Sequence, residues 1–233
     1  MDSKKALEIL LQNIACKNDL GKPENRWILH SIYVGLAARR IAHELSLDED
    51  YALTIGYMHD IGRSIKHNGH PIEGYLYLLN MGYPDIARYS ITHSFINNVI
   101  FSTAGGGPKD LESFNFIKKY LDSIEINIYD NIVQLCDLFC LETGFTTFEK
   151  RILDISQRKG VFSNSLEHFN NIMYLKDKIE KMMGKEIYSL FPEIKKEDLE
   201  NCEFDREKLI KLFENEEKTK KKVLIWYFLF LNI

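Results

Sequence analysis

The chain has few of the features that mark secreted, membrane-spanning or nucleic-acid-binding proteins. It contains four cysteines in 233 residues and no Cys-X-X-Cys pair, so we expect small buried thiols rather than disulfides or a cysteine zinc motif. The longest apolar run, Val223 to Leu231, is well short of the roughly 20 residues that span a bilayer. The N-terminal segment MDSKKALEIL lacks the apolar stretch of a signal peptide. We therefore expect a cytoplasmic protein with no membrane span.

Charge of one sign is also lacking, because 30 basic residues face 34 acidic ones and the formal net charge is −4. Proteins that bind nucleic acid usually carry a clear basic excess. We therefore expect no nucleic-acid partner for this chain.

Proline is scarce as well, with five residues in the chain, and strand-like alternation of apolar and polar residues is rare. Apolar residues instead recur at spacings of three and four, as they do on one face of an α-helix. The pattern predicts an all-α helical bundle with additional C-terminal helices. Asp48 is a predicted N-cap. The predicted helices cover residues 3–16, 24–45, 49–60, 71–80, 85–97, 111–121, 129–141, 147–159 and 164–183, and a charged stretch covers 193–222.

Six of the seven histidines lie between positions 30 and 93, and one of them forms an adjacent His59-Asp60 pair. Imidazole and carboxylate groups are common ligands of divalent metal ions. Asp137 lies in an otherwise apolar predicted helix, where an unpaired buried charge is costly and a cation is an economical partner. Helical bundles build metal sites from side chains on several helices. We therefore expect a metal site here, and we interpret His43 and His168 as structural or solvated.

Several motifs resemble those of the HD superfamily of metal-dependent phosphohydrolases, within it the HDIG-type branch. The similarity runs from about His30 to Gly160. His59-Asp60-Ile61-Gly62 is similar to the HDIG tetrapeptide of that branch. The segment from His70 to Gly74 resembles its HxxxG segment. Ile91-Thr92-His93-Ser94 resembles the segment that holds the next histidine.

The resemblance implies two divalent metal ions per chain. The candidate metals are Fe, Mn, Zn, Ni, Co and Mg. Asp60 would bridge the two ions, and Asp60 and His59 would both take part in catalysis. His67 is a rival of His70 as a ligand. The implied ligands of the first ion are His30, His59, Asp60 and Asp137, and those of the second are Asp60, His70 and His93.

Basic residues near the motifs are candidates for neutralising a phosphate group. Arg63 directly follows the HDIG tetrapeptide, and Lys66 is next. Lys109 lies in the Gly-rich segment 102–110, which lacks the GK[ST] ending of a P-loop and is either a mobile lid or a connector. His67 is a further candidate for substrate contact. Arg63 is also the candidate that acts in catalysis beside the metals.

The leading hypothesis is a phosphohydrolase that uses a metal-activated water to cleave a phosphoester or pyrophosphate bond of a small, nucleotide-like substrate. One alternative is a regulatory module that binds metal or nucleotide with little or no turnover. A di-iron oxygenase ranks lower, because Arg63 and Lys66 suit an anion. The expected organisation is an HD domain over residues 1–160 and a helical extension packed on it over 161–233. A homodimer is left open.

Overall fold

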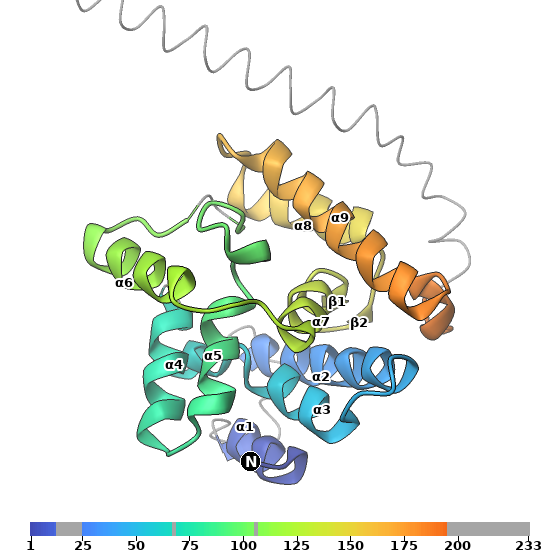
Figure 1. Ribbon diagram of the computed structural model, residues 1–233, viewed down its shortest axis with the longest axis horizontal. Coiled ribbons are helices and arrows are strands. Elements are labelled where there is room, and N and C mark those ends of the chain that lie inside the picture. Colours follow the sequence, from blue (N-terminus) through green and yellow to red (C-terminus); the bar gives the residue numbers. More distant parts are fainter. Residues whose placement is uncertain (13–24, 67–68, 105–106, 195–233) are drawn as a thin grey trace, which may run out of the picture.

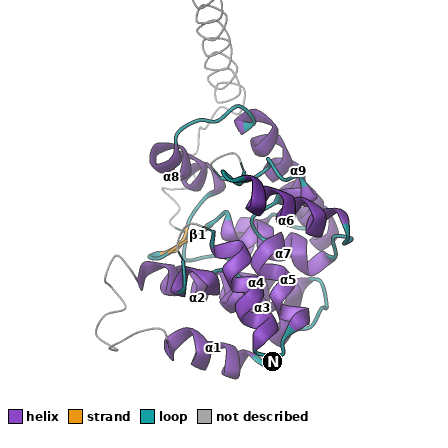
Figure 2. Cartoon of the chain, turned by 90° about the vertical axis from the view of Figure 1, so that its left-hand side faces the viewer, coloured by secondary structure: helices purple, strands orange, loops and turns teal. Residues whose placement is uncertain are grey.

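The computed structural model describes residues 1–12, 25–66, 69–104 and 107–194 of the chain. Over these ranges it forms nine α-helices, three short 3-10 helices and one small sheet (Figures 1 and 2), which confirms the predicted all-α class. The elements are α1 (Ser3–Gln12), α2 (Arg26–Glu44), α3 (Glu49–Met58), η3 (Ile61–Ser64), α4 (His70–Asn80), α5 (Pro84–Thr92), η4 (Ile96–Asn98), α6 (Leu111–Asp122), α7 (Ile128–Asp137), β1 (Cys140–Leu141), β2 (Gly144–Phe145), α8 (Phe148–Lys159), α9 (Ser165–Met183) and η5 (Ile187–Leu190). The predictions for 13–16, for 195–222 and for Val223–Leu231 lie outside the described residues.

Polar side chains fix where several helices begin. The Asp48 carboxylate accepts the backbone N–H of Tyr51 at 2.9 Å, which confirms the predicted N-cap of α3. Asp130, which lies near the start of the predicted helix over 129–141, is not the N-cap of that helix. Asn127 is the N-cap of α7, and Asp130 is three residues further on and accepts the Asn127 N–H in a capping box. Such caps are each worth about 1 kcal/mol.

Two predicted helices end earlier than expected, and histidines lie at their ends. α3 stops two residues before the predicted end, and α5 stops at Thr92 instead of continuing to Asn97. After α5 the backbone leaves the helical region at Phe95, with a φ of −125° and a ψ of 89°, and Asn97 follows with a left-handed φ of 55°. As a result His59 and His93 are C-caps, and their side chains lie where the helices terminate.

The predicted helix over 129–141 is also too long, because α7 ends at Asp137. The chain then turns into β1, which pairs antiparallel with β2. Cys140 therefore lies in a strand and not on one helix with Cys136. Both thiols are free and buried, as expected. The other two cysteines, Cys16 and Cys202, lie outside the described residues.

The helices pack around two main apolar clusters. One joins α2, α7 and α9 and contains Val34, Leu135 and Leu175, each fully buried. The other joins α1, α3 and α5 and contains Leu10 and Ile55. Burial of a side chain of this size stabilises the fold by about 1.5–3 kcal/mol. Figure 1 shows α2 and α3 side by side, with α4 and α5 as a second pair and α8 and α9 on the opposite side of α7.

A pair of glycines sets the distance between α2 and α3. A Cβ on Gly56 would lie 2.5 Å from the Cα of Gly35, and a Cβ on Gly35 would lie 2.5 Å from the Tyr57 ring. The two helix backbones therefore touch at this point, which only residues without a side chain allow. This contact brings His30, on α2, close to the end of α3.

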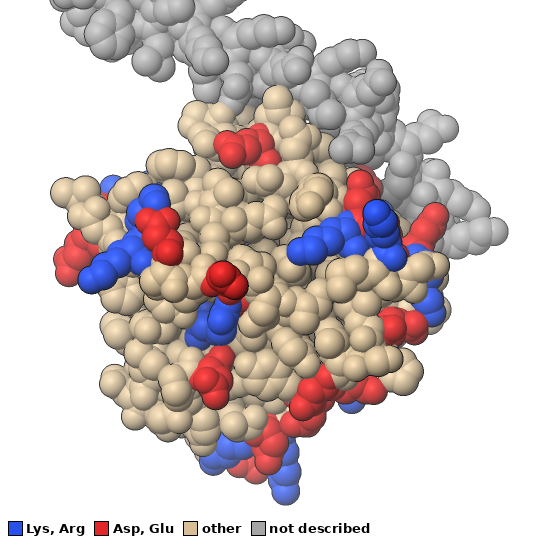
Figure 3. All heavy atoms as spheres, viewed as in Figure 1, with Lys and Arg blue, Asp and Glu red and all other residues tan. Residues whose placement is uncertain are grey.

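No helix in the described part of the chain is long and apolar enough to cross a membrane. On the face shown in Figure 3, basic and acidic side chains are interspersed, and neither sign gathers into a continuous patch.

We predict that Gly56→Ala lowers the free energy of unfolding by about 1–3 kcal/mol, because the added methyl group overlaps the α2 backbone. Helix propensity alone predicts the opposite sign, since alanine is favoured over glycine in a helix by about 1 kcal/mol. Urea unfolding of the variant and the wild type measures the sign. A stabilised variant would show that α2 and α3 are not in backbone contact.

Candidate metal centre

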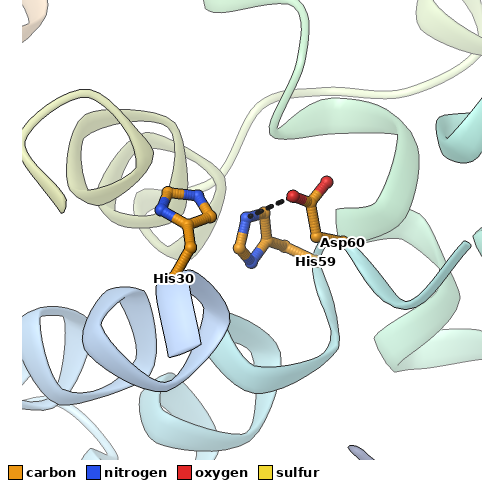
Figure 4. A group of neighbouring side chains, drawn as sticks. All are labelled: His30, His59 and Asp60. Carbon is orange, nitrogen blue, oxygen red and sulfur yellow. Dashed lines mark ion pairs between the residues drawn. The ribbon is translucent and has the colours of Figure 1, made fainter. Parts of the chain in front are cut away.

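The ligand-type side chains predicted from the sequence come from the ends or the inner faces of five helices and meet at one place in the bundle. Figure 4 shows three of them, His30, His59 and Asp60. The histidine of α2 and the His-Asp pair that follows α3 point toward one another there. Five of the six side chains lie at or just beyond a helix end, where side chains from different helices can meet. The converging residues are His30 in α2, His59 and Asp60 after α3, His70 at the start of α4, His93 after α5 and Asp137 at the end of α7.

Two of the histidine rings are held in the same way. The Nδ1–H of His59 donates to the carbonyl of Gly56 at 2.7 Å, and that of His93 donates to the carbonyl of Tyr89 at 2.8 Å. A carbonyl only accepts, so it fixes the tautomer and leaves Nε2 unprotonated; in His93 the Ser94 hydroxyl donates to this nitrogen at 2.9 Å. The His59 Nε2 atom is fully buried and has no hydrogen-bond partner among the described residues. Burial lowers the pKa of His59 to about 4, so this ring is neutral near pH 7.

His30 has a related arrangement. Its Nδ1–H donates to the carbonyl of Cys140 at 3.1 Å, and its Nε2 lies 2.8 Å from Asp137 Oδ1. A proton or a metal ion must lie between Nε2 and the carboxylate, because both would otherwise present lone pairs. Burial raises the pKa of Asp137, but the His30 contact and the charge of Arg151 outweigh it and hold this pKa well below its usual range.

Asp60 lies at the middle of the group and is 2% exposed. Its Oδ1 is 3.1 Å from His70 Nε2 and 3.6 Å from His93 Nε2, and its Oδ2 is 3.7 Å from His59 Nε2 and 2.5 Å from Arg63 Nε. Burial would raise the pKa of Asp60, but the Arg63 charge and then the imidazoles lower it well below 3.8. The carboxylate is therefore ionised, with the Arg63 guanidinium on Oδ2 and the nearest imidazole nitrogen, His70 Nε2, on the Oδ1 side.

These contacts define two overlapping groups of potential metal ligands. One ligand atom from each of His30, His59 and Asp60 lies within 4.8 Å of the others, and the same holds for Asp60, His70 and His93. Asp60 belongs to both groups. Three borderline-to-hard ligands, mostly buried and with fixed tautomers, fit a divalent transition metal. Asp137 is in neither group but joins the first through His30.

Gly62, the last residue of the His-Asp-Ile-Gly segment, explains how α4 comes close enough to place His70. A Cβ at Gly62 would lie 2.0 Å from the His70 carbonyl oxygen and 2.5 Å from the Gly74 nitrogen. A Cβ at Gly74 would in turn meet the Ser90 hydroxyl of α5 at 2.9 Å. The two motif glycines thus let the backbone after α3 touch that of α4, and let α4 pack on the Ser90 side chain of α5, behind the ligands.

The predicted phosphate-binding cations differ in position. Arg63 is at the centre, where its Nε donates to Asp60. Lys66 and Lys109 are exposed. Hydrogen bonds from Ser113 lower the pKa of Asp110, and the Lys66 charge adds to them, so Lys66 lies toward the start of α6. The role of both lysines stays a prediction, and His67 lies outside the described residues.

Sequence reasoning missed the residue that holds the His93 segment. Gln134 of α7 is buried and its Nε2 donates to the carbonyls of Thr92 and Phe95, at 2.8 and 3.1 Å, on either side of His93. Its position one turn before Asp137, on the same helix, was the available signal. α7 therefore both supplies a carboxylate and fixes a histidine from α5.

The structure also changes the interpretation of His168. It is buried in α9, and its Nδ1 lies 3.1 Å from the hydroxyl of Ser102, which also accepts a hydrogen bond from Asn171. His168 is therefore a structural histidine, as predicted, and it is not solvated. This contact ties the start of the segment 102–110 to α9. Burial lowers the pKa of His168 to about 4.

Comparison with known proteins agrees with this geometry. Residues 27–140 match the family model of the HD domain. No curated protein and no solved structure gave a match. The matched region runs from the start of α2 to β1 and contains all six converging ligand-type residues. We conclude that this part of the chain belongs to the HD domain family, whose members are metal-dependent hydrolases that bind divalent ions.

We predict that the metal-free protein loses stability as the pH falls from about 6.5 toward 4. His168 has a folded-state pKa of about 4 and an ordinary unfolded pKa of 6.5, so the unfolded chain binds more protons in this window. Each such histidine contributes a slope of up to about 1.4 kcal/mol per pH unit. His168→Gln should have a shallower slope than the wild type. Urea unfolding at several pH values, with a chelator present, measures it; equal slopes would show that His168 is not buried in neutral form.

Proposed function

We propose that the protein is a metal-dependent phosphohydrolase that cleaves a phosphoester or pyrophosphate bond of a small, nucleotide-like substrate. We further propose that it is of the HDIG type and binds two divalent ions per chain. The membership of residues 27–140 in the HD domain family supports the reaction class. The nucleotide-like nature of the substrate is supported by the resemblance of the motifs alone.

The observation that carries the proposal is the position of Asp60 in both groups of potential ligands. A carboxylate has two oxygens and can bridge two ions, whereas each imidazole has one nitrogen facing the centre. The His70 and His93 nitrogens lie on the Oδ1 side of Asp60, and the His59 nitrogen lies on the Oδ2 side. This division supports His30, His59, Asp60 and Asp137 as ligands of one ion, and Asp60, His70 and His93 as ligands of the other.

When bound, divalent ions in such a site would polarise a phosphoryl oxygen and bring the pKa of a water close to neutrality. The chain's own residues prepare the site for this chemistry. Asp60 and His59 present fixed ligand atoms from a buried position that excludes bulk water. Arg63 orients Asp60 through its Nε, and we propose that its charge also attracts the phosphate.

The C-terminal part of the chain forms a second unit in the proposed organisation. We propose that residues 1–160 form the HD domain and that 161–233 form an extension packed on it. The packing of α9 on α7 supports this for the described part.

The direct test is release of phosphate or of a nucleoside product from a panel of nucleotides and phosphoesters. We expect turnover that is abolished by a chelator and restored by one or more of Mn²⁺, Fe²⁺, Zn²⁺, Ni²⁺, Co²⁺ and Mg²⁺. Metal binding with no turnover of any substrate would favour a regulatory module. Oxygen uptake coupled to substrate loss would favour an oxygenase.

Two substitutions test the shared role of Asp60. We predict that Asp60→Ala removes both ions and all phosphohydrolase activity, because it deletes a ligand from each group. We predict that His70→Ala removes one ion and leaves the other. Elemental analysis of the purified variants measures the metal content per chain.

His43→Ala is the matched control, because His43 is exposed, forms an ion-pair contact with Glu49 and belongs to neither group of potential ligands. It should keep the metal content and activity of the wild type. An Asp60→Ala variant that retains one ion would refute the bridge. Full metal content in His70→Ala would instead point to His67 as the ligand.

A further inference from the structure

Several arginines of the described residues lie close to carboxylates, and two of them bind their carboxylate through the same edge of the guanidinium group, Nε and Nη2. Arg88 places Nε and Nη2 on the two oxygens of Asp130, at 3.2 and 2.6 Å. Arg158 places the same two atoms on Asp154, at 2.9 and 2.6 Å. This is the two-pronged geometry in which a guanidinium binds a planar or tetrahedral oxyanion.

Arg151, on α8, does not fill this edge. Its Nη1 donates to Asp154 at 3.1 Å, but its Nε is buried and has no hydrogen-bond partner among the described residues. Its Nη2 lies 3.6 Å from Asp137 Oδ1, which is within ion-pair range and beyond a hydrogen bond. The side chain is 12% exposed, so water reaches little of it. A buried donor with no acceptor is costly, and an added oxyanion would supply one.

The two carboxylates near Arg151 also contact other groups, so they neutralise its positive charge only in part. Asp154 already accepts two hydrogen bonds from Arg158, and Asp137 Oδ1 accepts a closer contact from His30. If Asp137 also binds a metal ion, that ion neutralises the charge of its carboxylate. The Nε and Nη2 edge of Arg151 then lies at the metal centre without a carboxylate of its own.

We propose that Arg151 binds a phosphate group of the substrate through Nε and Nη2. This inference rests on the proposed function and adds to it a second cation, which comes from outside the segment 27–140 that matches the HD domain. Arg151 touches Asp137, whereas Arg63 touches Asp60, so the two guanidinium groups meet the ligand set at different carboxylates. A substrate phosphate can thus be held from two directions.

The test is calorimetric titration of the metal-loaded protein with inorganic phosphate. We expect Arg151→Gln to weaken binding by about 10- to 100-fold, as the loss of charge-assisted hydrogen bonds to an anion predicts. Arg158→Gln is the matched control. It removes a guanidinium from the same helix, and from the same Asp154, but not one that faces Asp137. We expect less than about a twofold change for this control.

Elemental analysis of each variant separates binding of phosphate from support of Asp137. Arg151→Gln should keep the wild-type metal content. A variant that loses metal together with phosphate affinity would show that Arg151 positions Asp137, which would overturn the inference. Equal affinity of Arg151→Gln and wild type, or no detectable binding by the wild type, would overturn it as well.

Arg151→Lys provides a second measurement if Arg151→Gln does not fold. It keeps the charge and loses the two-pronged edge, so we expect an affinity below that of the wild type with unchanged metal content. An affinity equal to that of the wild type would contradict the use of Nε and Nη2. Absence of metal-dependent turnover would refute the proposed function but would leave the result of this titration standing.

Discussion

A carboxylate taken out of water must be compensated by positive charge or by hydrogen-bond donors, and Asp60 is the point where this requirement shapes the fold. The idealised cost of burying such a charge without partners is tens of kcal/mol, far more than the net stability of a domain. Asp60 is nevertheless ionised, because the Arg63 charge lowers its pKa, and the three histidines beside it are ligands that could hold a further cation. Those partners come from separate segments, so the burial of one charge requires the ends of α3, α4 and α5 to meet.

Helix ends and glycines make that meeting possible. His59 and His93 follow the last turns of their helices, and His70 opens another. Gly56 lets α3 touch α2, and Gly62 lets the turn after α3 touch the start of α4. Backbone carbonyls then fix the histidine tautomers, so that the inward nitrogens keep their lone pairs. Backbone contacts therefore fix the positions of the ligand-type side chains and the orientation of their rings, as contacts behind the ligands do in metal sites.

The sequence was informative where the signal is local and chemical. The His59-Asp60 pair, the other histidines and the apolar surroundings of Asp137 were enough to select residues that the structure brings together. Caps such as Asp48 were also predictable, because one polar side chain and the next turn decide them. The helix ends after α5 and α7 were not, since the departure of the backbone from the helical region at Phe95 and the pairing of β1 with β2 decide those.

Contacts between distant segments were the other part that the sequence could not supply. Gln134 donates to the carbonyls of Thr92 and Phe95, which lie about 40 residues earlier in the chain. The residues around Gln134 in the sequence do not identify those partners. Arg151 belongs to a helix beyond the matched domain, and its approach to Asp137 depends on how α8 packs. Tertiary packing overrides local pattern in such cases. Basic residues were therefore chosen by their nearness to the motif, as Arg63 and Lys66 were, or by their place in the Gly-rich segment, as Lys109 was, and Arg151 was not among them.

The most direct test of this account is the metal content of the purified protein, measured per chain by elemental analysis. Two divalent metal ions per chain are the predicted result, because Asp60 belongs to two groups of potential ligands. One ion per chain would contradict the bridging role of Asp60. No ion, even after reconstitution with each candidate metal, would contradict the central claim that the buried carboxylate and its histidines form a metal centre.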